Sequence, residues 1–319
     1  MSLLEESKVY KPFKYPWAVE YAVSHEKTHW GEWEAKLQED VSQWQGGKLS
    51  AQEKHHITQI LKLFTQSDVA VGRNYLEYYI PKFKNNEIRA MLTSFANREF
   101  VHQRSYALLN DTLGLPEAEF SAFLEYESMK NKVDFMGDID MNSHAGTAMA
   151  IARSVMNEGM SLFSAFAMLV NYQRFGKMRG MCEVVEWSIR DESTHCEGMV
   201  RLFREFCEEH PRIVTDEFKK AIYDMFRTGV ALEDKVIDNA FEMGNVEGLT
   251  AEEVKRYIRY IADRRLIQLG LKGNWKVKEN PIEWLDWVIN GASHKNFVEG
   301  TVTDYNADGM EGDWGWSAA

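Results

Sequence analysis

The sequence predicts an all-α protein in which long helices form a bundle, and three observations support this prediction. Apolar residues recur at helical spacing along nearly the whole chain, and no segment shows the alternation of a strand. Only six prolines occur among 319 residues. Two pairs of predicted helices also carry carboxylate and histidine side chains at matching levels, an arrangement typical of bundles that bind two metal ions.

The expected elements follow from this periodicity and from turn and cap residues. Residues 1–30 mix aromatic and charged side chains and should form an extended arm with one short helix. We expect helices at about residues 51–80, 86–113, 117–130, 143–171, 177–208, 214–242 and 251–271. Ser50 and Glu53 form a capping box at the first of these, and Gly114 ends the second. Residues 131–142 should form a loop.

The C-terminal part of the chain differs in character. Three tryptophans lie within residues 275–290 and should pack on the outside of the bundle. From about residue 293 the sequence is polar and rich in Gly and Asp, which favours a mobile tail. No linker-like segment precedes residue 290, so we expect one helical domain over residues 1–292 and a flexible tail over residues 293–319.

Composition and charge argue against several classes of function. The net charge is −12 and no long basic run occurs, so direct binding to nucleic-acid phosphates is not expected. No run of about 18 apolar residues occurs and the first residues lack the apolar stretch of a signal peptide, so we expect no membrane span. The three cysteines are few, odd in number and set in helical pattern, which favours a reduced, cytoplasmic setting.

Two Glu-x-x-His pairs carry the strongest chemical signal. Glu99 and His102 form one pair, and Glu192 and His195 form the other. Residues at positions i and i+3 share a helix face, so each pair can bind one metal ion. Two further Glu-x-x-His pairs lie before the long helices or within the Ser50 capping box, and they are weaker candidates.

A lone carboxylate precedes each pair at a similar distance. Asp68 lies 31 positions before Glu99, and Glu158 lies 34 positions before Glu192. Turn signals lie midway in each interval, so each segment should fold into an antiparallel hairpin with its two acids at one level. The six side chains would then form a site for two metal ions. The alternative is a set of buried ionisable groups with separate structural reasons, and such burial is costly.

The ligand types indicate which metals would bind. Carboxylates and imidazoles without thiolates suit iron or manganese, so the expected pair is Fe/Fe, Mn/Mn or Mn/Fe. Metal storage, oxygen activation and radical generation all occur on ferritin-like bundles, so the fold does not choose among them.

Tyr106 is a candidate redox residue. It lies seven positions after Glu99 and four after His102, on the same face of the predicted helix, and should point toward the metals. A buried tyrosine is usually a core residue with a satisfied hydroxyl, so position alone leaves a redox role open.

Six short motifs, in chain order, match those of a known family. They are Trp30-x3-Glu34-x2-Leu37-x2-Asp40, Asp68 within Gln66-Ser-Asp-Val, Glu99-x2-His102-x3-Tyr106, Asn157-Glu158-Gly159, Arg190-Asp191-Glu192-x2-His195, and Asn296-Phe-Val-Glu299 followed by Tyr305. The last motif matches with one substitution, because Val298 stands where the family has Phe. Over residues 30–305 the chain resembles the small, radical-generating subunit of class I ribonucleotide reductase. Each motif is modest alone, and the order of all six makes the resemblance specific.

The resemblance implies a ferritin-like fold, a homodimer and a large catalytic subunit as partner. It implies that the two metals react with an oxygen species and oxidise Tyr106, or hold the oxidising equivalent themselves. The radical would pass through Trp30, Asp191 and His102 and leave through Tyr305 to the large subunit, where ribonucleotides are reduced to deoxyribonucleotides. Sequence alone leaves open which histidine Asp191 orients, and the family indicates His102.

Two departures from the family pattern affect the oxidant. The tyrosine pocket should be lined by Leu162, Phe166 and Ser188, where Leu162 replaces a commonly aromatic residue and Ser188 is polar where Ile is common. A wetter pocket would shorten the life of a tyrosyl radical and leaves a manganese-containing or metal-centred oxidant open. Trp33, close to Trp30, leaves open which tryptophan relays the radical.

The alternative is a ferritin-like dimetal oxidase or metal-storage protein that acts without a partner subunit. Such proteins usually carry Glu as the first ligand and lack an aromatic tail, so Asp68 and Tyr305 argue against this alternative. Trp314 and Trp316 lie near the end of the chain and are candidates for docking in an apolar groove of the large subunit, because Trp is enriched at binding hot spots.

Overall fold

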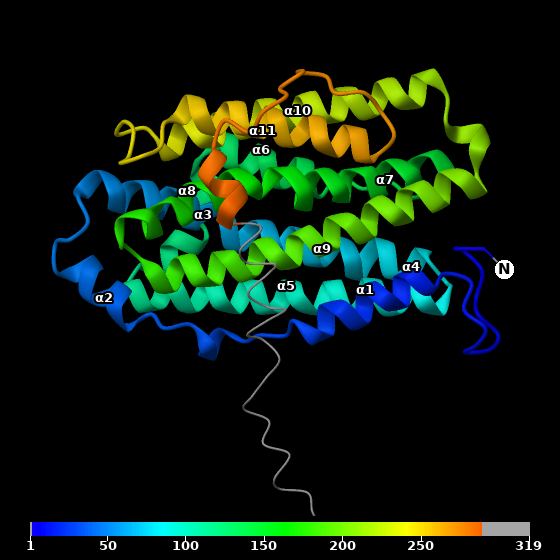
Figure 1. Cartoon of the computed structure of the whole chain (residues 1–319), viewed down its shortest axis with the longest axis horizontal. Coiled ribbons are helices and arrows are strands. Elements are labelled where there is room, and N and C mark those ends of the chain that lie inside the picture. The colour runs from blue at the N-terminus through cyan, green and yellow to red at the C-terminus, as the bar shows by residue number, and fades with distance from the viewer. Residues whose placement is uncertain (1, 289–319) are drawn as a thin grey trace, which may run out of the picture.

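The computed structural model of the chain describes residues 2–288, which form helices joined by turns and loops (Figure 1). Within this range the single pairing of strand type is an isolated bridge between Val246 and Leu249. The prediction of an all-α fold is therefore confirmed.

The α-helices agree with most of the predicted ranges. They are α1 (Pro16–Lys27), α2 (Gln38–Gln45), α3 (Ala51–Asn74), α4 (Ile80–Lys82), α5 (Asn86–Leu113), α6 (Glu127–Met136), α7 (His144–Met156), α8 (Phe163–Val170), α9 (Arg179–Glu209), α10 (Asp216–Ala240) and α11 (Ala251–Gln268). Short 3₁₀ turns lie at Glu32–Glu34, Glu117–Phe120, Ala122–Glu125, Asn171–Phe175 and Pro211–Ile213.

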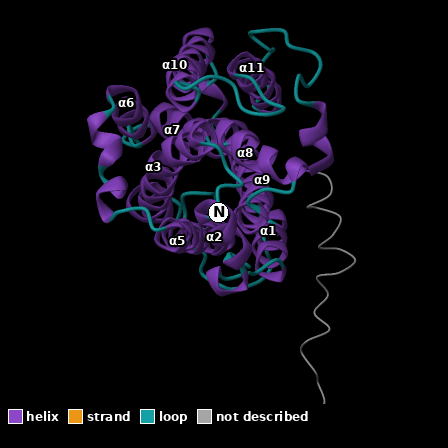
Figure 2. Cartoon of the chain, turned by 90° about the vertical axis from the view of Figure 1, so that its left-hand side faces the viewer, coloured by secondary structure: helices purple, strands orange, loops and turns teal. Residues whose placement is uncertain are grey.

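The bundle has an inner set of helices and an outer set. Seen from its end, α3, α5, α9 and the α7–α8 segment surround the interior, and α3 packs against α5 while α7 and α8 pack against α9 (Figure 2). The outer set is formed by α10 and α11 on one side, with α6 beside α3 and α1 beside α5. The predicted hairpins are thus both present, and each contributes two helices to the inner set.

Helix ends follow the predicted cap chemistry. The Ser50 hydroxyl accepts from the Glu53 backbone N–H while the Glu53 carboxylate accepts from the Ser50 N–H, so the capping box is confirmed. Gly114 ends α5 with a φ of 72°, a left-handed conformation that glycine adopts without the steric cost of a Cβ.

The two helices that carry the lone carboxylates are not α-helical throughout. A π-helical turn at Tyr75–Tyr79 follows α3, and a second at Asn157–Ser161 separates α7 from α8. The uninterrupted helices predicted for residues 51–80 and 143–171 are therefore wrong in this detail. Single π turns within helices are frequent at functional sites, and the second one contains Glu158.

The segment after α5 also differs from the prediction. Two 3₁₀ turns replace the first part of the helix expected at residues 117–130, and α6 continues to Met136 through the start of the expected loop. Met129 and Met136 are fully buried, and the Lys132 ammonium lies 2.8 Å from a carboxylate oxygen of Glu233 on α10. These long-range contacts extend a helix that the local sequence, rich in charge, did not indicate.

The main hydrophobic core extends through the described residues, with buried members from Leu3 to Val288, and a smaller second cluster is formed by Leu63, Phe123, Met129 and Val236. The expectation for the C-terminal tryptophans is met in part, because Trp275 and Trp284 are partly buried against this core whereas Trp287 is exposed. The whole of the predicted tail, including Tyr305, Trp314 and Trp316, lies outside the described residues, so the domain boundary at 292 stays a prediction.

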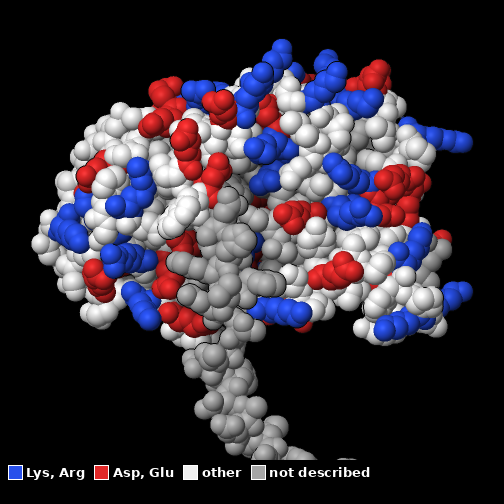
Figure 3. Space-filling view, viewed as in Figure 1, with Lys and Arg blue, Asp and Glu red and all other residues white. Residues whose placement is uncertain are grey.

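The described surface carries charges of both signs. Lysine and arginine side chains alternate with aspartate and glutamate side chains over the face drawn in Figure 3. Among the described helices, none is both long and apolar enough to span a membrane. This face therefore carries a mixture of both charges, and the charged side chains that stand out are those buried inside the bundle.

Candidate metal centre

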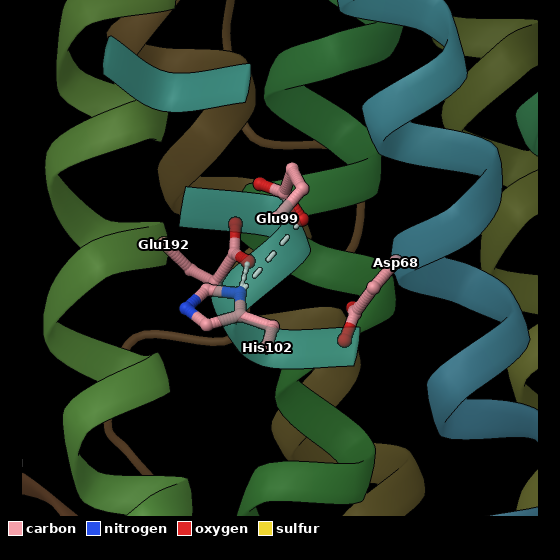
Figure 4. Close-up of side chains that lie close together, drawn as sticks. All are labelled: Asp68, Glu99, His102 and Glu192. Carbon is pink, nitrogen blue, oxygen red and sulfur yellow. Dashed lines mark ion pairs between the residues drawn. The ribbon is translucent and has the colours of Figure 1, made fainter. Parts of the chain in front are cut away.

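The six predicted ligands converge inside the bundle. Four helical elements supply them: Asp68 comes from α3, Glu99 and His102 from α5, Glu158 from the second π turn, and Glu192 and His195 from α9. Every one of the six is at most 1% exposed. Figure 4 shows Asp68, Glu99, His102 and Glu192 pointing toward one another from three helices.

The ligand atoms form two overlapping groups. One consists of Asp68, Glu99, His102 and Glu192, and the other of Glu99, Glu158, Glu192 and His195, with the atoms of each group within 4.8 Å of one another. Since Glu99 and Glu192 belong to both groups, they can bridge two metal ions. The other members would then bind one ion each.

The imidazoles face the carboxylates through Nδ1. His195 Nδ1 lies 3.1 Å from Glu99 Oε1, 3.2 Å from Glu158 Oε2 and 3.4 Å from Glu192 Oε2. His102 Nδ1 lies 3.2 Å from Glu192 Oε1. Both histidines thus direct the same nitrogen to the centre and leave Nε2 for partners outside it.

Several of the potential metal-ligand atoms form no hydrogen bond with the protein, as expected if they bind a pair of metal ions. Asp68 Oδ2, both carboxylate oxygens of Glu99 and of Glu192, and His195 Nδ1 are buried without a hydrogen bond of acceptable geometry. Buried charged groups are costly unless they are paired or bound to metal. Hard oxygen and imidazole donors at this density match iron or manganese.

The pKa values express the same electrostatic problem. Burial raises the pKa of Asp68 well above its ordinary value. Burial opposes the charged form of both imidazoles, but the surrounding carboxylates outweigh it and raise the pKa of His102 and of His195 well above the ordinary value. These shifts follow from the burial of several carboxylates around two imidazoles, a concentration of negative charge that bound cations would balance.

Two hydroxyl groups hold Glu158. The Tyr75 hydroxyl donates a 2.6 Å hydrogen bond to Glu158 Oε2, and the Ser154 hydroxyl donates to Glu158 Oε1. Sequence reasoning missed both partners. The signal for Tyr75 was available, because it lies seven positions after Asp68 on the inward face of its helix, as Tyr106 does after Glu99.

Tyr106 is fully buried beside the centre. Its hydroxyl donates a 2.8 Å hydrogen bond to Ser188 Oγ, and Ser188 Oγ donates in turn to the Val184 carbonyl at 3.0 Å. The Phe64 ring lies 4.3 Å from the Tyr106 ring, centroid to centroid. Burial, followed by the charge of Asp68, raises the pKa of the Tyr106 hydroxyl well above its ordinary value.

Of the three residues expected to line the Tyr106 pocket, one makes a polar contact with the tyrosine. Ser188 is this partner, and the Phe166 ring lies 5.2 Å from that of Phe64, centroid to centroid. Leu162 and Phe166 are each 1% exposed. The pocket thus combines one hydroxyl partner with buried apolar side chains.

Trp30, Asp191 and His102 form a continuous chain of contacts. The Trp30 indole N–H donates a 2.7 Å hydrogen bond to Asp191 Oδ2, and the same oxygen lies 3.3 Å from His102 Nε2. Asp191 thus adjoins His102, and the tryptophan that contacts Asp191 is Trp30, which is 2% exposed whereas Trp33 is 70% exposed. Hydrogen bonding to His102, with the nearby arginines Arg98 and Arg190, outweighs burial and holds the pKa of the Asp191 carboxyl below its ordinary value.

His25 is a residue of the centre that sequence reasoning did not identify. It is buried on α1, and its Nε2 lies 3.1 Å from His195 Nε2 while its Nδ1 lies 2.9 Å from Ser94 Oγ. Nothing in the local pattern of α1 indicates this contact, because it depends on how α1 packs across α5 and α9.

The two weaker Glu-x-x-His pairs do not join the metal centre. Glu53 caps α3 and pairs with Lys177 at 2.7 Å, and His56 Nδ1 lies 2.9 Å from the Tyr172 hydroxyl. The other pair, Glu26 and His29, lines a cavity between α1 and α5.

A comparison with known proteins identifies the family. A family model described as ribonucleotide reductase, small chain, matches residues 7–281. The chain belongs to this family. It is 38% identical over 335 aligned residues to a probable ribonucleoside-diphosphate reductase small subunit of invertebrate iridescent virus 3, which covers 99% of this chain and 89% of the relative. It is 29% identical to the ribonucleoside-diphosphate reductase subunit beta of Chlamydia pneumoniae, over 93% of this chain and 90% of the relative.

Solved structures of ribonucleotide reductase subunits share the fold. The R2 subunit from Clostridium botulinum superposes with a TM-score of 0.83 at 23% identity, over 91% of this chain and 94% of that chain. The dimanganese(II)-NrdF of Streptococcus sanguinis gives a TM-score of 0.79 at 21% identity, over 90% of this chain and 99% of that chain. The ferritin-like bundle and the enzyme class are confirmed: the chain is a small subunit of ribonucleotide reductase, an oxidoreductase.

Proposed function

We propose that this small subunit generates and stores a one-electron oxidant at a two-metal centre and passes it to the large subunit for ribonucleotide reduction. The observation that carries the proposal is the enclosure of six ligand side chains, several of whose ligand atoms are buried without a hydrogen bond. Two bound iron or manganese ions, or one of each, would supply the one-electron oxidising equivalent. The proposed ligands are Asp68, Glu99, His102, Glu158, Glu192 and His195.

Tyr106 is the residue that we propose to hold the radical. Its ring is enclosed and contacts Phe64, so water is excluded from one side of the phenol. Burial keeps the phenol neutral before oxidation, because it raises the pKa of the hydroxyl. A positively charged oxidised phenol would be unstable in the same buried place, so loss of the electron would be coupled to loss of the hydroxyl proton. Ser188 is the hydrogen-bond partner at the phenol oxygen.

We propose that the radical leaves through Trp30 and Asp191. Trp30 stacks at 5.9 Å on the His102 ring, centroid to centroid, and both side chains contact Asp191 Oδ2. The Asp191 carboxylate orients the His102 imidazole and accepts a hydrogen bond from the Trp30 indole N–H. A proton and an electron can therefore move together along these contacts. Tyr305 would continue the route to the large subunit, in the tail that begins near residue 293.

Two further parts of the proposal concern association. We propose a homodimer, and the exposed apolar side chains of Val69 and Leu76 from the α3 segment and of Phe100 and Leu108 from α5 support it, because α3 and α5 pack side by side. We also propose cytoplasmic location and docking of the large subunit through the tail. The alternative of a dimetal oxidase without partner gains no support from the family match or from the Trp30 contacts.

The proposal is tested by loading the purified protein with iron or manganese under air and mixing it with a cognate large subunit. We expect two metal ions per chain, a radical or mixed-valence signal in electron paramagnetic resonance, and deoxyribonucleotide formation that requires both subunits. Glu192→Ala should lower the metal content and abolish turnover, whereas Glu186→Ala, on the same helix but partly exposed, should retain both. Wild-type protein that binds no metal, or that supports turnover without any, would contradict the proposal.

A further inference from the structure

His25 lies on α1, a helix that supplies none of the six proposed ligands, and it contacts the ligand His195. It is 1% exposed, and its ring centroid lies 4.9 Å from that of His195 and 5.3 Å from that of Phe95. Its Nε2 lies 3.1 Å from His195 Nε2 and 4.0 Å from Asp191 Oδ1, and its Nδ1 lies 2.9 Å from Ser94 Oγ. The ring is therefore held on both sides rather than filling space in the core.

The protons on these nitrogens follow from the ligand geometry. His195 Nδ1 faces three carboxylates, so Nδ1 is its ligand atom and the proton of a neutral ring stays on Nε2. His195 Nε2 then donates to His25 Nε2, which must be the unprotonated nitrogen. His25 carries its proton on Nδ1 and donates it to Ser94 Oγ. This assignment gives a hydrogen bond to His195 Nε2 and to both nitrogens of a neutral His25, and it leaves His195 Nδ1 free to bind metal.

The other ligand histidine has a different kind of partner. His102 Nε2 lies 3.3 Å from a carboxylate oxygen of Asp191, an anionic acceptor. His195 Nε2 faces an uncharged imidazole instead. Remote partners of this kind fix the orientation and tautomer of a metal-bound histidine, and charged acceptors form the stronger hydrogen bonds. The nearest partner of each ligand histidine is thus a different residue, Asp191 for His102 and His25 for His195, although Asp191 Oδ1 also lies 4.0 Å from His25 Nε2.

We propose that His25 is a positioning residue for His195 and that it supports the half of the centre formed by Glu158 and His195, while Asp191 supports the half formed by Asp68 and His102. This inference rests on the proposed metal centre. It goes further by assigning each half its own remote partner, so that loss of one partner weakens one half and spares the other.

The surroundings of Ser94 explain why this support is needed. Ser94 lines a cavity of about 740 Å³ between α1 and α5, together with Glu26, His29 and Arg89. His25 and Ser94 therefore stand between this cavity and the His195 ring. Without the His25 ring, His195 Nε2 would have lost its acceptor on the side that faces the cavity.

Metal titration of the purified protein tests the inference without any activity measurement. Wild-type protein should bind two Mn²⁺ per chain. His25→Leu should weaken binding at one position about 10- to 100-fold, the usual cost of removing a remote partner of a metal-bound histidine. His25→Gln should restore much of the loss, because its amide can accept from His195 and donate to Ser94.

Occupancies from the anomalous scattering of Mn²⁺ in crystals identify the half that is affected. We expect His25→Leu to lower occupancy at the position bound by Glu158 and His195, and Asp191→Asn to lower it at the position bound by Asp68 and His102. His56→Leu is the matched control, since it removes another buried histidine that hydrogen-bonds elsewhere. Both positions should stay at wild-type occupancy in that variant.

The outcomes distinguish failure of the proposed role of His25 from failure of the proposed metal centre. Wild-type protein without bound Mn²⁺ would contradict the metal centre itself. Two wild-type affinities in His25→Leu, or equal losses at both positions, would overturn the role of His25 while leaving the centre intact. If His25→Leu does not fold, Ser94→Ala provides the test: it removes the group that anchors His25 and should weaken only the His195 half, and no change would again overturn the inference.

Discussion

The indole nitrogen of Trp30 and the carboxylate of Asp191 lie 2.7 Å apart although 161 positions separate them in the chain. The contact places the N-terminal segment against α9 at the position where Asp191 also contacts His102. Three side chains, those of His102, Asp191 and Trp30, therefore connect the metal centre to the N-terminal arm. The neighbouring Trp33 side chain points to solvent and offers no such path.

The first prediction concerns this path. Trp30→Phe should reduce nucleotide reduction to background, because Phe can neither donate to Asp191 nor be oxidised as readily as Trp. The metal content and the Tyr106 radical signal should persist, as both lie on the other side of His102. Trp33→Phe is the control and should behave as wild type. Turnover by Trp30→Phe at the wild-type rate would exclude it from the relay.

The second prediction concerns the stored oxidant. Tyr106→Phe should remove any tyrosyl signal from electron paramagnetic resonance. Ser188→Ala should keep the signal but alter its g values, since the hydrogen bond at the phenol oxygen is lost, and should cost about 1 kcal/mol of unfolding free energy. Full turnover by Tyr106→Phe would show that the metals store the oxidising equivalent and that the tyrosine is a core residue.

The third prediction concerns the hydroxyl groups that hold Glu158. Tyr75→Phe removes a buried hydrogen bond to a carboxylate and should lower the free energy of unfolding of the metal-free protein by roughly 1.5–3 kcal/mol. The freed Glu158 should also bind metal less well. Tyr172→Phe is the control, because the buried Tyr172 hydroxyl contacts His56 Nδ1 and the Glu53 carbonyl, outside the ligand set. Denaturant unfolding and Mn²⁺ titration measure both effects, and equal losses in the two variants would refute a specific role for Tyr75.

The fourth prediction concerns pH. The pKa of His102 and of His195 is raised in the metal-free fold, so their protonation stabilises the fold fully below about pH 6.5 and this contribution is lost as pH rises through the raised values. The raised pKa of Asp68 acts in the same direction. Metal-free protein should therefore lose stability from pH 6 to pH 8, as measured by thermal unfolding.

Metal binding should reverse this trend. The ligands must release their protons to bind metal, so affinity for Mn²⁺ should rise with pH and binding should release protons into a weakly buffered solution. A colour indicator or calorimetry in buffers of different ionisation enthalpy measures the release. Binding without proton release would mean that the imidazoles are already neutral in the metal-free protein.

Sequence reasoning identified the candidate metal ligands better than the residues that hold those ligands in place. Glu99 and His102, or Glu192 and His195, share a helix face by spacing alone, so their convergence could be predicted from the helical period. The contact of His25 with His195 could not, because it depends on how α1 crosses α5 and α9. Local periodicity says nothing about such packing.

The same limit explains the errors in the fold. The sequence around Glu158 has an ordinary helical pattern of apolar residues, but the π turn there adds one residue to the helical turn. A hydrophobic pattern does not reveal such an added residue. The extension of α6 through Lys132 depends on Glu233, about a hundred positions later in the chain. Caps such as Ser50 were predictable because all their partners lie within one turn.

The last prediction concerns the tail, which lies outside the described residues. Trp314 and Trp316 are aromatic side chains of the kind enriched at binding hot spots, within a segment too polar to form a core of its own. Deleting residues 312–319 should weaken association with the large subunit and leave the metal content unchanged. Tyr305→Phe should leave association intact and stop nucleotide reduction, because Phe is far harder to oxidise than Tyr.

Docking and radical transfer should therefore separate in two assays on the same pair of variants. Pull-down with the large subunit measures docking, and deoxyribonucleotide formation at saturating large subunit measures transfer. The truncated protein should recover turnover as the partner concentration rises, whereas Tyr305→Phe should not recover at any concentration. Normal binding by the truncated protein would exclude the tryptophans from docking, and an active Tyr305→Phe would exclude Tyr305 from the relay.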